Sequence, residues 1–360
     1  MFQRVNRIAT LLLLAALVTG CGPPAAPPIA ETLTGQTMGT SYHIHLASLP
    51  EGTSTAALQR RIDAALETVN EQMSTYRPES EISRFNASES TDWFPVSPAT
   101  ALVVAEAQRI SAESGGAFDV TVMPLVNLWS FGPEARPDEV PSDAAIAERK
   151  SYVGYRHLQV RDEPPALRKA IPKLQVDLSA IAKGYGVDVV AELLEEAGIG
   201  GYMVEIGGEV RTKGHKADGS PWRIGIEKPV TNRRAVQRIL KLETDAVATS
   251  GDYRNFFQED GVRYSHTIDP RTGRPIGHSL VAVSVLADSC MTADARATTV
   301  MVLGPTEGYN WLVERKIAAV LFVKSDAGFE ELGTPAFKSR SGENSARIAQ
   351  RGAKTVGAGS

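Results

Sequence analysis

One segment of the chain combines an acidic residue, a lysine and the expected start of a helix. A strand expected at residues 174–178 runs into a helix expected at 180–197, and Lys183 falls in the first turn of that helix. Free backbone N–H groups and the positive end of the helix dipole attract anions at such a place. A lysine there opposes the dipole unless an anion compensates it. The segment therefore indicates either a bound anion or a solvated lysine behind two capping residues, Asp177 and Ser179.

A second segment could hold a hard cation. Asp294 and Thr298 lie at i, i+4 in a helix expected to begin near Ser289, so their side chains share one face. A carboxylate and a hydroxyl without histidine or cysteine suit Mg2+, which takes oxygen ligands and completes its shell with water and substrate phosphate. The alternatives are a solvated helix face or a threonine that bonds to its own helix backbone.

A third segment, residues 264–275, contains the turn sequence Asp-Pro-Arg-Thr-Gly. Proline presets φ and glycine supplies a positive φ, so this is a strong turn signal. The turn places His266 and Asp269 at the end of a strand, where a side chain can face a cleft. A histidine titrates near neutral pH and could act as a general base. The alternative is a structural histidine whose hydrogen bonds are satisfied.

Two glycine-rich turns, at residues 115–119 and 206–209, match neither a P-loop nor the Gly-x-Gly-x-x-Gly opening of a dinucleotide-binding unit. Nucleotide binding of the Rossmann or P-loop kind is therefore excluded. Glycines do allow the backbone to approach a flat or phosphorylated ligand closely, and Phe118 could stack on a ring.

The composition is that of a globular protein without a strong overall charge. The 360 residues include 38 Lys+Arg and 42 Asp+Glu, for a formal net charge of −4. No basic field would attract nucleic acid, and the length suits one large domain or two ordinary ones. The two cysteines, Cys21 and Cys290, lie far apart, which excludes a disulfide scaffold or a thiolate metal cluster. We expect Cys290 to be a small core residue.

The N-terminus has the features of a cleavable leader. Arg4 and Arg7 precede an apolar run at residues 8–18 that is too short to span a bilayer, and small residues lead up to Cys21. We expect a lipoprotein signal peptide at 1–20, with Cys21 lipidated and the protein anchored to a membrane. The alternative is an ordinary secretory signal. Residues 21–32, rich in proline and alanine, are expected to form a tether.

The remaining pattern predicts a mixed α+β fold rather than a doubly wound parallel sheet, because strands outnumber helices and do not alternate with them. We expect mainly antiparallel sheets with packed helices in one domain at residues 33–333. Residues 334–360 are polar and glycine-containing, and are expected to be a disordered tail. The expected strands are 41–46, 174–178, 202–206, 222–227, 239–242, 280–286 and 317–323, and the expected helices are 58–73, 98–114, 142–150, 180–197, one from near 289, and 306–315.

The order of these segments, more than any one of them, resembles the ApbE family of flavin transferases. The resemblance runs from about Thr34 to Val323. It implies an ApbE-like, T-fold-related architecture and a periplasmic, often lipid-anchored protein. The segments that carry it are Met38-Gly39-Thr40, 73–76 with 81–86, 116–121, 177–184, Gly207-Gly208-Glu209, 249–253, 266–273 and 293–298.

The resemblance implies a Mg2+-dependent reaction. A threonine hydroxyl of an acceptor protein attacks the FMN phosphorus of FAD, AMP leaves, and the flavin stays attached through a phosphoester. Acceptors in the family are membrane-bound subunits of respiratory or electron-transfer complexes, such as sodium-pumping NADH:quinone reductase (Nqr) and Rnf-type complexes. Two other functions remain open, namely a Mg2+-dependent FAD pyrophosphatase that yields FMN and AMP, and a non-catalytic flavin-binding lipoprotein.

The resemblance also implies roles for single residues. Asp294, Thr298 and the backbone carbonyl of Ala180 would bind Mg2+, although some members carry an acidic residue in place of Ala297. His266 is the candidate base, with Asp269 orienting its loop. Other members carry Glu where this chain has Lys183, which we expect to favour phosphate. The implied FAD contacts are Met38, Tyr76, Ala117, Phe118, Asp119, Asp177, Lys183 and Ile268.

Overall fold

The computed structural model describes residues 31–134, 139–227, 236–252, 256–326 and 328–341. The predicted leader, Cys21 and the predicted tether up to residue 30 lie outside these residues, as does 342–360. Within the described ranges, no helix is long and apolar enough to cross a membrane. The first strand begins at Glu31, so the last two residues assigned to the predicted tether, Glu31 and Thr32, belong to the sheet.

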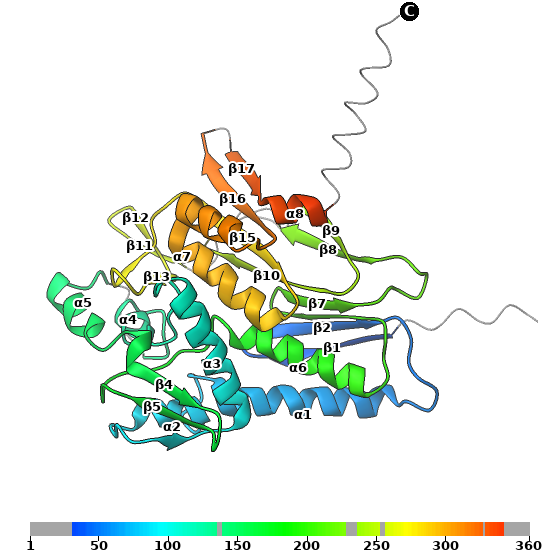
Figure 1. Ribbon diagram of the computed structural model, residues 1–360, viewed down its shortest axis with the longest axis horizontal. Coiled ribbons are helices and arrows are strands. Elements are labelled where there is room, and N and C mark those ends of the chain that lie inside the picture. The colour runs from blue at the N-terminus through cyan, green and yellow to red at the C-terminus, as the bar shows by residue number, and fades with distance from the viewer. Residues whose placement is uncertain (1–30, 135–138, 228–235, 253–255, 327, 342–360) are drawn as a thin grey trace, which may run out of the picture.

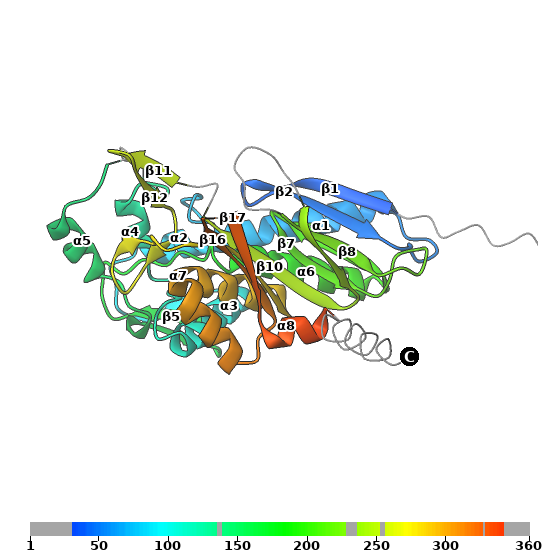
Figure 2. The ribbon, with the colours of Figure 1, turned by 90° about the horizontal axis from the view of Figure 1, so that it is seen from above.

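One large sheet organises the molecule (Figures 1 and 2). It has eight strands, and every neighbouring pair is antiparallel, which confirms the predicted α+β class. In spatial order the strands are β1 (Glu31–Thr37), β2 (Thr40–Leu46), β6 (Tyr202–Ile206), β7 (Glu209–Lys213), β10 (Asp245–Gly251), β15 (Leu280–Ala287), β16 (Ala319–Ser325) and β17 (Gly328–Gly333).

Three helices cover one face of this sheet (Figure 1), namely α1 (Thr55–Met73), α6 (Ala182–Glu196) and α7 (Cys290–Glu314). The predicted apolar stripe of α1 is buried: its first part packs with β2, β6 and α6, and Val69 and Met73 pack with residues of α2 and α3. A kink at Gly304, with φ of 79°, divides α7 where the sequence predicted two separate helices. The segment expected to bind a cation lies near the start of α7, where Thr298 lies beside Ser250 of β10 and Asp294 beside Gly184 of α6.

The opposite face is covered by the ribbon of β8 (Trp222–Glu227) and β9 (Val236–Leu242) and by α8 (Pro335–Arg340). The helix α8 lies where a disordered tail was predicted, and this part of that prediction is wrong. Thr334 caps α8 by accepting a hydrogen bond from the Phe337 backbone N–H, and the Phe337 side chain is buried against Val320 and Phe322. A single aromatic residue in a polar segment gave too little signal to predict this helix.

The smaller elements gather at one end of the sheet in both views (Figures 1 and 2). The helices there include α3, which begins after Ser97 as predicted and ends before Gly115. These elements are α2 (Glu81–Ala87), β3 (Phe94–Pro95), α3 (Pro98–Glu113), α4 (Met123–Leu128), α5 (Asp143–Lys150), η1 (Tyr155–His157), β4 (Leu158–Arg161), β5 (Ala166–Lys169), and the two hairpins β11 (Phe256–Glu259) with β12 (Val262–Ser265) and β13 (Ile268–Asp269) with β14 (Arg274–Pro275).

The strand predicted at 174–178 is not formed, apart from one isolated bridge between Gln175 and Val122. The segment is instead fixed by the Asn86 side chain, which donates to the Val176 carbonyl (2.8 Å) and accepts from its N–H (2.7 Å). The buried Lys169 ammonium donates to carbonyls of this region, including that of Leu174 at 3.1 Å. Side chains therefore replace a partner strand in holding the chain that leads into Asp177.

Candidate active site

A cavity of about 490 Å³ opens where α6, α7, the end of β10 and the loop after β12 meet. It contains most of the residues that the sequence singled out, from segments that are far apart in the chain. These residues are Tyr76, Ala117, Phe118, Asp119, Asp177, Ala180, Lys183, His266, Ile268, Asp294 and Thr298. The structure thus brings the expected flavin contacts other than Met38, the expected cation ligands and the candidate base to one place.

Asp294 lies deep in this cavity, in the second turn of α7, and is 2% exposed. Its Oδ2 accepts a hydrogen bond from the backbone N–H of Gly184 at 3.0 Å. That N–H belongs to the first turn of α6, where such groups lack a partner within their own helix. A Cβ atom on Gly184 would lie 2.4 Å from the Cys290 carbonyl oxygen, so only glycine permits this approach of the two helices.

Lys183 faces two carboxylates. Its Nζ lies 2.9 Å from Glu209 Oε1 and 3.7 Å from Asp294 Oδ2. Burial alone would lower the pKa of Lys183, but these carboxylates raise it above its ordinary value, so the side chain is a fixed cation. The anion that compensates Lys183 at the helix N-terminus is therefore supplied by the protein itself.

Glu209 is a cavity residue to which the sequence analysis gave no role. Its side chain is 3% exposed, and its Oε2 is buried without a hydrogen-bond partner among the described residues. Burial raises the pKa of Glu209, Lys183 opposes this shift, and the nearby Asp294 reinforces it. The Gly-Gly-Glu turn was visible in the sequence, but nothing local indicated that its glutamate would meet Lys183.

The donor set in the cavity fits a hard divalent cation. Asp294 offers a carboxylate, Ala180 a backbone carbonyl, and Thr298 a hydroxyl that lies 3.4 Å from the Ser250 hydroxyl. Within the described part of the chain, no group of three or more His, Cys, Asp or Glu side chains could hold a metal. A site with one carboxylate and neutral oxygens suits Mg2+, which keeps several waters or substrate oxygens.

The walls of the cavity suit a flat ligand. Phe118 and Ala117 are almost fully buried and line one side, while Tyr76 is 67% exposed. Asp119 does not present a free carboxylate, because it accepts hydrogen bonds from the backbone N–H groups of Thr121 (2.8 Å) and Tyr155 (2.7 Å). Burial raises the pKa of Asp119, and these hydrogen bonds partly offset the shift. Asp119 therefore shapes the loop that presents Phe118.

Two other predicted residues lie apart from this cavity. Met38, with φ of 49°, lines a second cavity of about 500 Å³ between the β1–β2 turn and α1. Asp269 is buried, and its carboxylate accepts from the Arg271 backbone N–H (2.8 Å) and guanidinium (3.0 Å), so it braces the Asp-Pro-Arg-Thr-Gly turn. Asp177 lines the main cavity but does not cap α6, which begins after Ile181, and its Oδ1 accepts from the Ser179 N–H at 2.9 Å.

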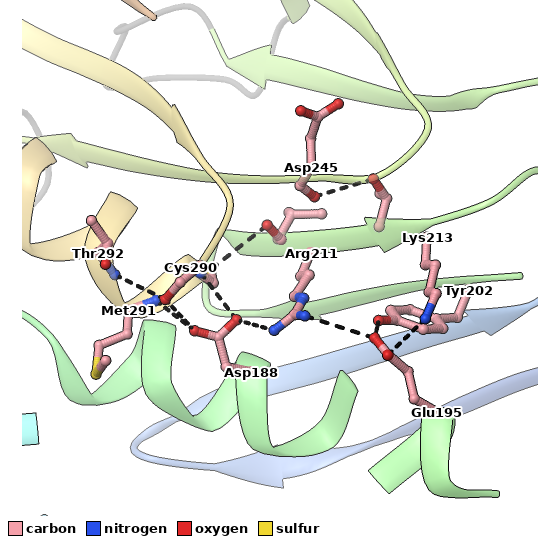
Figure 3. Close-up of polar contacts among 12 residues, drawn as sticks. Asp188, Glu195, Tyr202, Arg211, Lys213, Asp245, Cys290, Met291 and Thr292 are labelled. Atoms are coloured by element: carbon pink, nitrogen blue, oxygen red, sulfur yellow. Dashed lines mark hydrogen bonds and ion pairs between the residues drawn. The ribbon is translucent and has the colours of Figure 1, made fainter. Parts of the chain in front are cut away.

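A second carboxylate, Asp188 of α6, binds the start of the helix that carries Asp294 (Figure 3). Asp188 accepts hydrogen bonds from the backbone N–H groups of Cys290 (3.0 Å) and Met291 (2.9 Å) and from the Ser289 hydroxyl (2.8 Å). It also accepts from the guanidinium of Arg211 on β7 at 2.7 Å. Asp188 thus binds the N-terminus of α7 just as Asp294 binds that of α6. Cys290 is buried in this interface, as predicted.

Comparison with known proteins gives consistent matches over most of the chain. A family model described as the ApbE family matches residues 38–322. A FAD:protein FMN transferase of Vibrio cholerae is 53% identical over 331 residues, which cover 92% of this chain and 96% of that protein. A protein of the same name from Haemophilus influenzae is 45% identical over 314 residues, covering 85% and 90%.

Solved structures agree with this result. The flavin transferase ApbE from Vibrio cholerae superposes with a TM-score of 0.81 at 52% identity, covering 87% of this chain and 99% of that one. The flavinyl transferase ApbE of Pseudomonas stutzeri, in its apo form, gives 0.80 at 41% identity, covering 87% and 97%. The protein is therefore a transferase with the fold of these relatives. The chain belongs to the ApbE family.

Proposed function

We propose that this protein transfers FMN from FAD to a threonine hydroxyl of an acceptor protein and releases AMP. The names of its relatives support flavin transfer. The observation that carries the finer proposal is that one cavity holds both the oxygen pair of Asp294 and Thr298 and the imidazole of His266. Phosphoryl transfer needs charge neutralisation on one side of the phosphorus and a positioned nucleophile on the other.

In this proposal, Asp294, Thr298 and the Ala180 carbonyl would hold Mg2+, which when bound neutralises pyrophosphate charge and stabilises the leaving phosphate. The protein fixes the Asp294 carboxylate through the Gly184 N–H before any ligand arrives. Lys183, held by Glu209, adds a fixed positive charge beside the pyrophosphate. Phe118 and Ala117 supply the apolar wall for the flavin ring.

His266 is the proposed base. It accepts the proton of the acceptor threonine while the hydroxyl oxygen forms a bond to the FMN phosphorus. The bond from that phosphorus to the bridging oxygen breaks, and AMP leaves with the electron pair. The histidine later returns its proton to solvent, so it is regenerated.

The decisive experiment incubates the purified protein with FAD and Mg2+, with and without an acceptor domain. AMP is followed by chromatography and the acceptor mass by spectrometry. An FMN adduct on an acceptor threonine that disappears with chelator supports the transferase. Equal amounts of AMP and free FMN without acceptor would favour a pyrophosphatase, and bound FAD without AMP would indicate a binding protein.

Replacing His266 by Ala is expected to lower the rate of flavin transfer about a hundredfold, because general-base catalysis is lost. The affinity for FAD should stay within about twofold of that of the unmodified protein, because the imidazole of His266 packs on Phe131 and need not contact the flavin. Transfer assays quenched at a series of times measure the rate, and titration with FAD measures the affinity. The control is His215→Ala, at an exposed histidine paired with Glu243. Weaker FAD binding with unchanged turnover would exclude the role as base.

We also place the protein in the cell envelope, anchored through lipidated Cys21 and facing the periplasm. The leader pattern and the stiff segment after it support this location. The acceptors we propose are subunits of membrane-bound electron-transfer complexes of the Nqr and Rnf type, because a lipid anchor holds the enzyme at the same membrane surface.

A further inference from the structure

Three charged side chains from separate elements meet in the main cavity. Lys183 lies in the first turn of α6, Glu209 is the first residue of β7, and Asp294 lies in the second turn of α7. The Lys183 Nζ is 2.9 Å from Glu209 Oε1 and 3.7 Å from Asp294 Oδ2. One ammonium therefore lies close to two carboxylates, and we call these three residues the charged triad.

The two carboxylates of the charged triad are buried, whereas the ammonium is its accessible member. The side chains of Glu209 and Asp294 are each 3% exposed, and that of Lys183 is 31% exposed. Ionised carboxylates that are buried near one another repel each other, and both lose their hydration. Among the described residues, Lys183 is the cation that reaches both of them and compensates their charge.

Glu209 has Lys183 as its partner. Within the described ranges, its carboxylate pairs with no other cation, and its Oε2 has no hydrogen-bond partner. That oxygen lies beside the turn before β7, since a Cβ atom on Gly207 would be 3.5 Å from it. The Cys290 thiol, which is buried in the same region, stays neutral because burial raises its pKa. Glu209 therefore acts on the cavity through its own charge and through the position of Lys183.

Asp294 is held in a different way. Its Oδ2 accepts the Gly184 N–H at 3.0 Å, while the 3.7 Å separation from Lys183 Nζ is too long for a hydrogen bond. Lys183 is thus bonded to Glu209 and only close to Asp294. A second cation at Asp294 would meet the positive charge of Lys183, and like charges repel more strongly in a buried site than in water.

We propose that Lys183 is the resident counter-ion of the metal site before Mg2+ binds, and that Glu209 holds it beside Asp294. The ammonium compensates the buried carboxylates while no metal is bound. Mg2+ then competes with Lys183 for the negative charge at Asp294, so Lys183 and Glu209 set the Mg2+ concentration at which the site fills. The inference rests on the proposed function, in which Asp294 is a metal ligand. Glu209 is a positioning residue, because it acts through Lys183.

The two residues affect the affinity for Mg2+ in opposite directions. Lys183 lowers this affinity, because its charge repels a second cation. Glu209 raises the affinity, because it adds a negative charge and keeps the ammonium bonded to itself rather than to Asp294. A role in folding alone would not give opposite signs, since loss of either partner would break the same buried ion pair.

Calorimetric titration of the FAD-free protein with Mg2+ tests these signs without an activity assay. Lys183→Met removes the charge and keeps an unbranched side chain, and it is expected to tighten Mg2+ binding about tenfold. Glu209→Gln is expected to weaken it about tenfold, because the released ammonium turns to Asp294. The variant with both substitutions should bind within about threefold of the original protein, because the net charge of the site is then restored.

Thermal unfolding gives a second readout. Added Mg2+ should raise the unfolding temperature further in Lys183→Met than in the original protein, because the metal then compensates both carboxylates. The matched control is Lys213→Met. Lys213 Nζ lies 2.6 Å from Glu195, and this lysine–carboxylate pair does not line the cavity. The control should bind Mg2+ as the original protein does.

The proposal is overturned if the two single substitutions shift the affinity for Mg2+ in the same direction, or if neither shifts it. If Lys183→Met does not fold without metal, Glu209→Gln and the double variant decide, since neither leaves two uncompensated carboxylates. If the original protein binds no Mg2+, the metal assignment fails and this inference fails with it. If it binds Mg2+ but transfers no flavin, the proposed function fails alone, and the titrations still decide the roles of Lys183 and Glu209.

Discussion

Replacing Asp294 by Asn is expected to abolish both AMP release and flavin transfer, with a loss of at least about a thousandfold. The carboxylate is the single acidic group in the proposed oxygen donor set, and a metal that neutralises a pyrophosphate contributes several kcal/mol to the transition state. The fold should survive, because the amide oxygen of asparagine can still accept the Gly184 N–H that Asp294 Oδ2 accepts now. This variant therefore separates the ligand role from the structural one.

The measurement combines AMP release, acceptor mass and Mg2+ titration, with thermal unfolding as the check on folding. Asp288→Asn is the matched control, since Asp288 is an exposed carboxylate just before α7. That control should keep full activity. Unimpaired AMP release by folded Asp294→Asn at low Mg2+ concentration would show that Asp294 does not hold the metal.

Replacing Asp188 by Ala is expected to destabilise the protein by about 3 kcal/mol, because it removes the nearer partner of a largely buried guanidinium and leaves Arg211 with only Glu195 at 3.7 Å. The guanidinium of Arg211 would lose its 2.7 Å partner, and the N–H groups of Cys290 and Met291 would lose their acceptor (Figure 3). A negative charge at a helix N-terminus is also favourable in itself, and that contribution would disappear.

Urea unfolding at neutral pH measures this loss. Asp188→Asn should cost less than Asp188→Ala, since an amide oxygen keeps one acceptor for the end of α7. Glu192→Gln, at an exposed position on the same helix, should change the free energy of unfolding by less than about 0.5 kcal/mol. A loss below about 1 kcal/mol in Asp188→Ala would show that this carboxylate does not hold α7 in place.

Much of the site could be predicted because its residues lie in compact local segments. The i, i+4 spacing of Asp294 and Thr298 depends only on helix geometry, and α7 places both in the cavity. The pairing of Lys183 with Glu209 could not be predicted in this way. It depends on β7 lying beside the start of α6, which is a property of the sheet order rather than of either segment.

The incorrect strand at 174–178 has a similar cause. Leu174, Val176 and Leu178 alternate with polar residues and are all buried, so the pattern fitted a strand. The Val176 N–H and carbonyl are bonded to the Asn86 side chain and the Leu174 carbonyl to Lys169, and the Leu178 carbonyl accepts from the backbone N–H of Ile181, so none of them needs a partner strand. Hydrophobic periodicity indicates which residues are buried, but it does not indicate which groups form hydrogen bonds with their backbone.

If Asp294 binds the metal as proposed, the exchange of caps between α6 and α7 makes cation binding and folding depend on one another. Asp294 is at once the acceptor for the first turn of α6 and the proposed metal ligand, and the turn that carries it is held by Asp188. Any change that loosens the contact between the two helices must weaken the metal site, and an ion bound there must in turn stabilise the contact. In that case a substitution that changes the metal affinity of this site would also change the stability of the core, and we expect heat tolerance and tolerance of low metal concentration to vary together among the relatives.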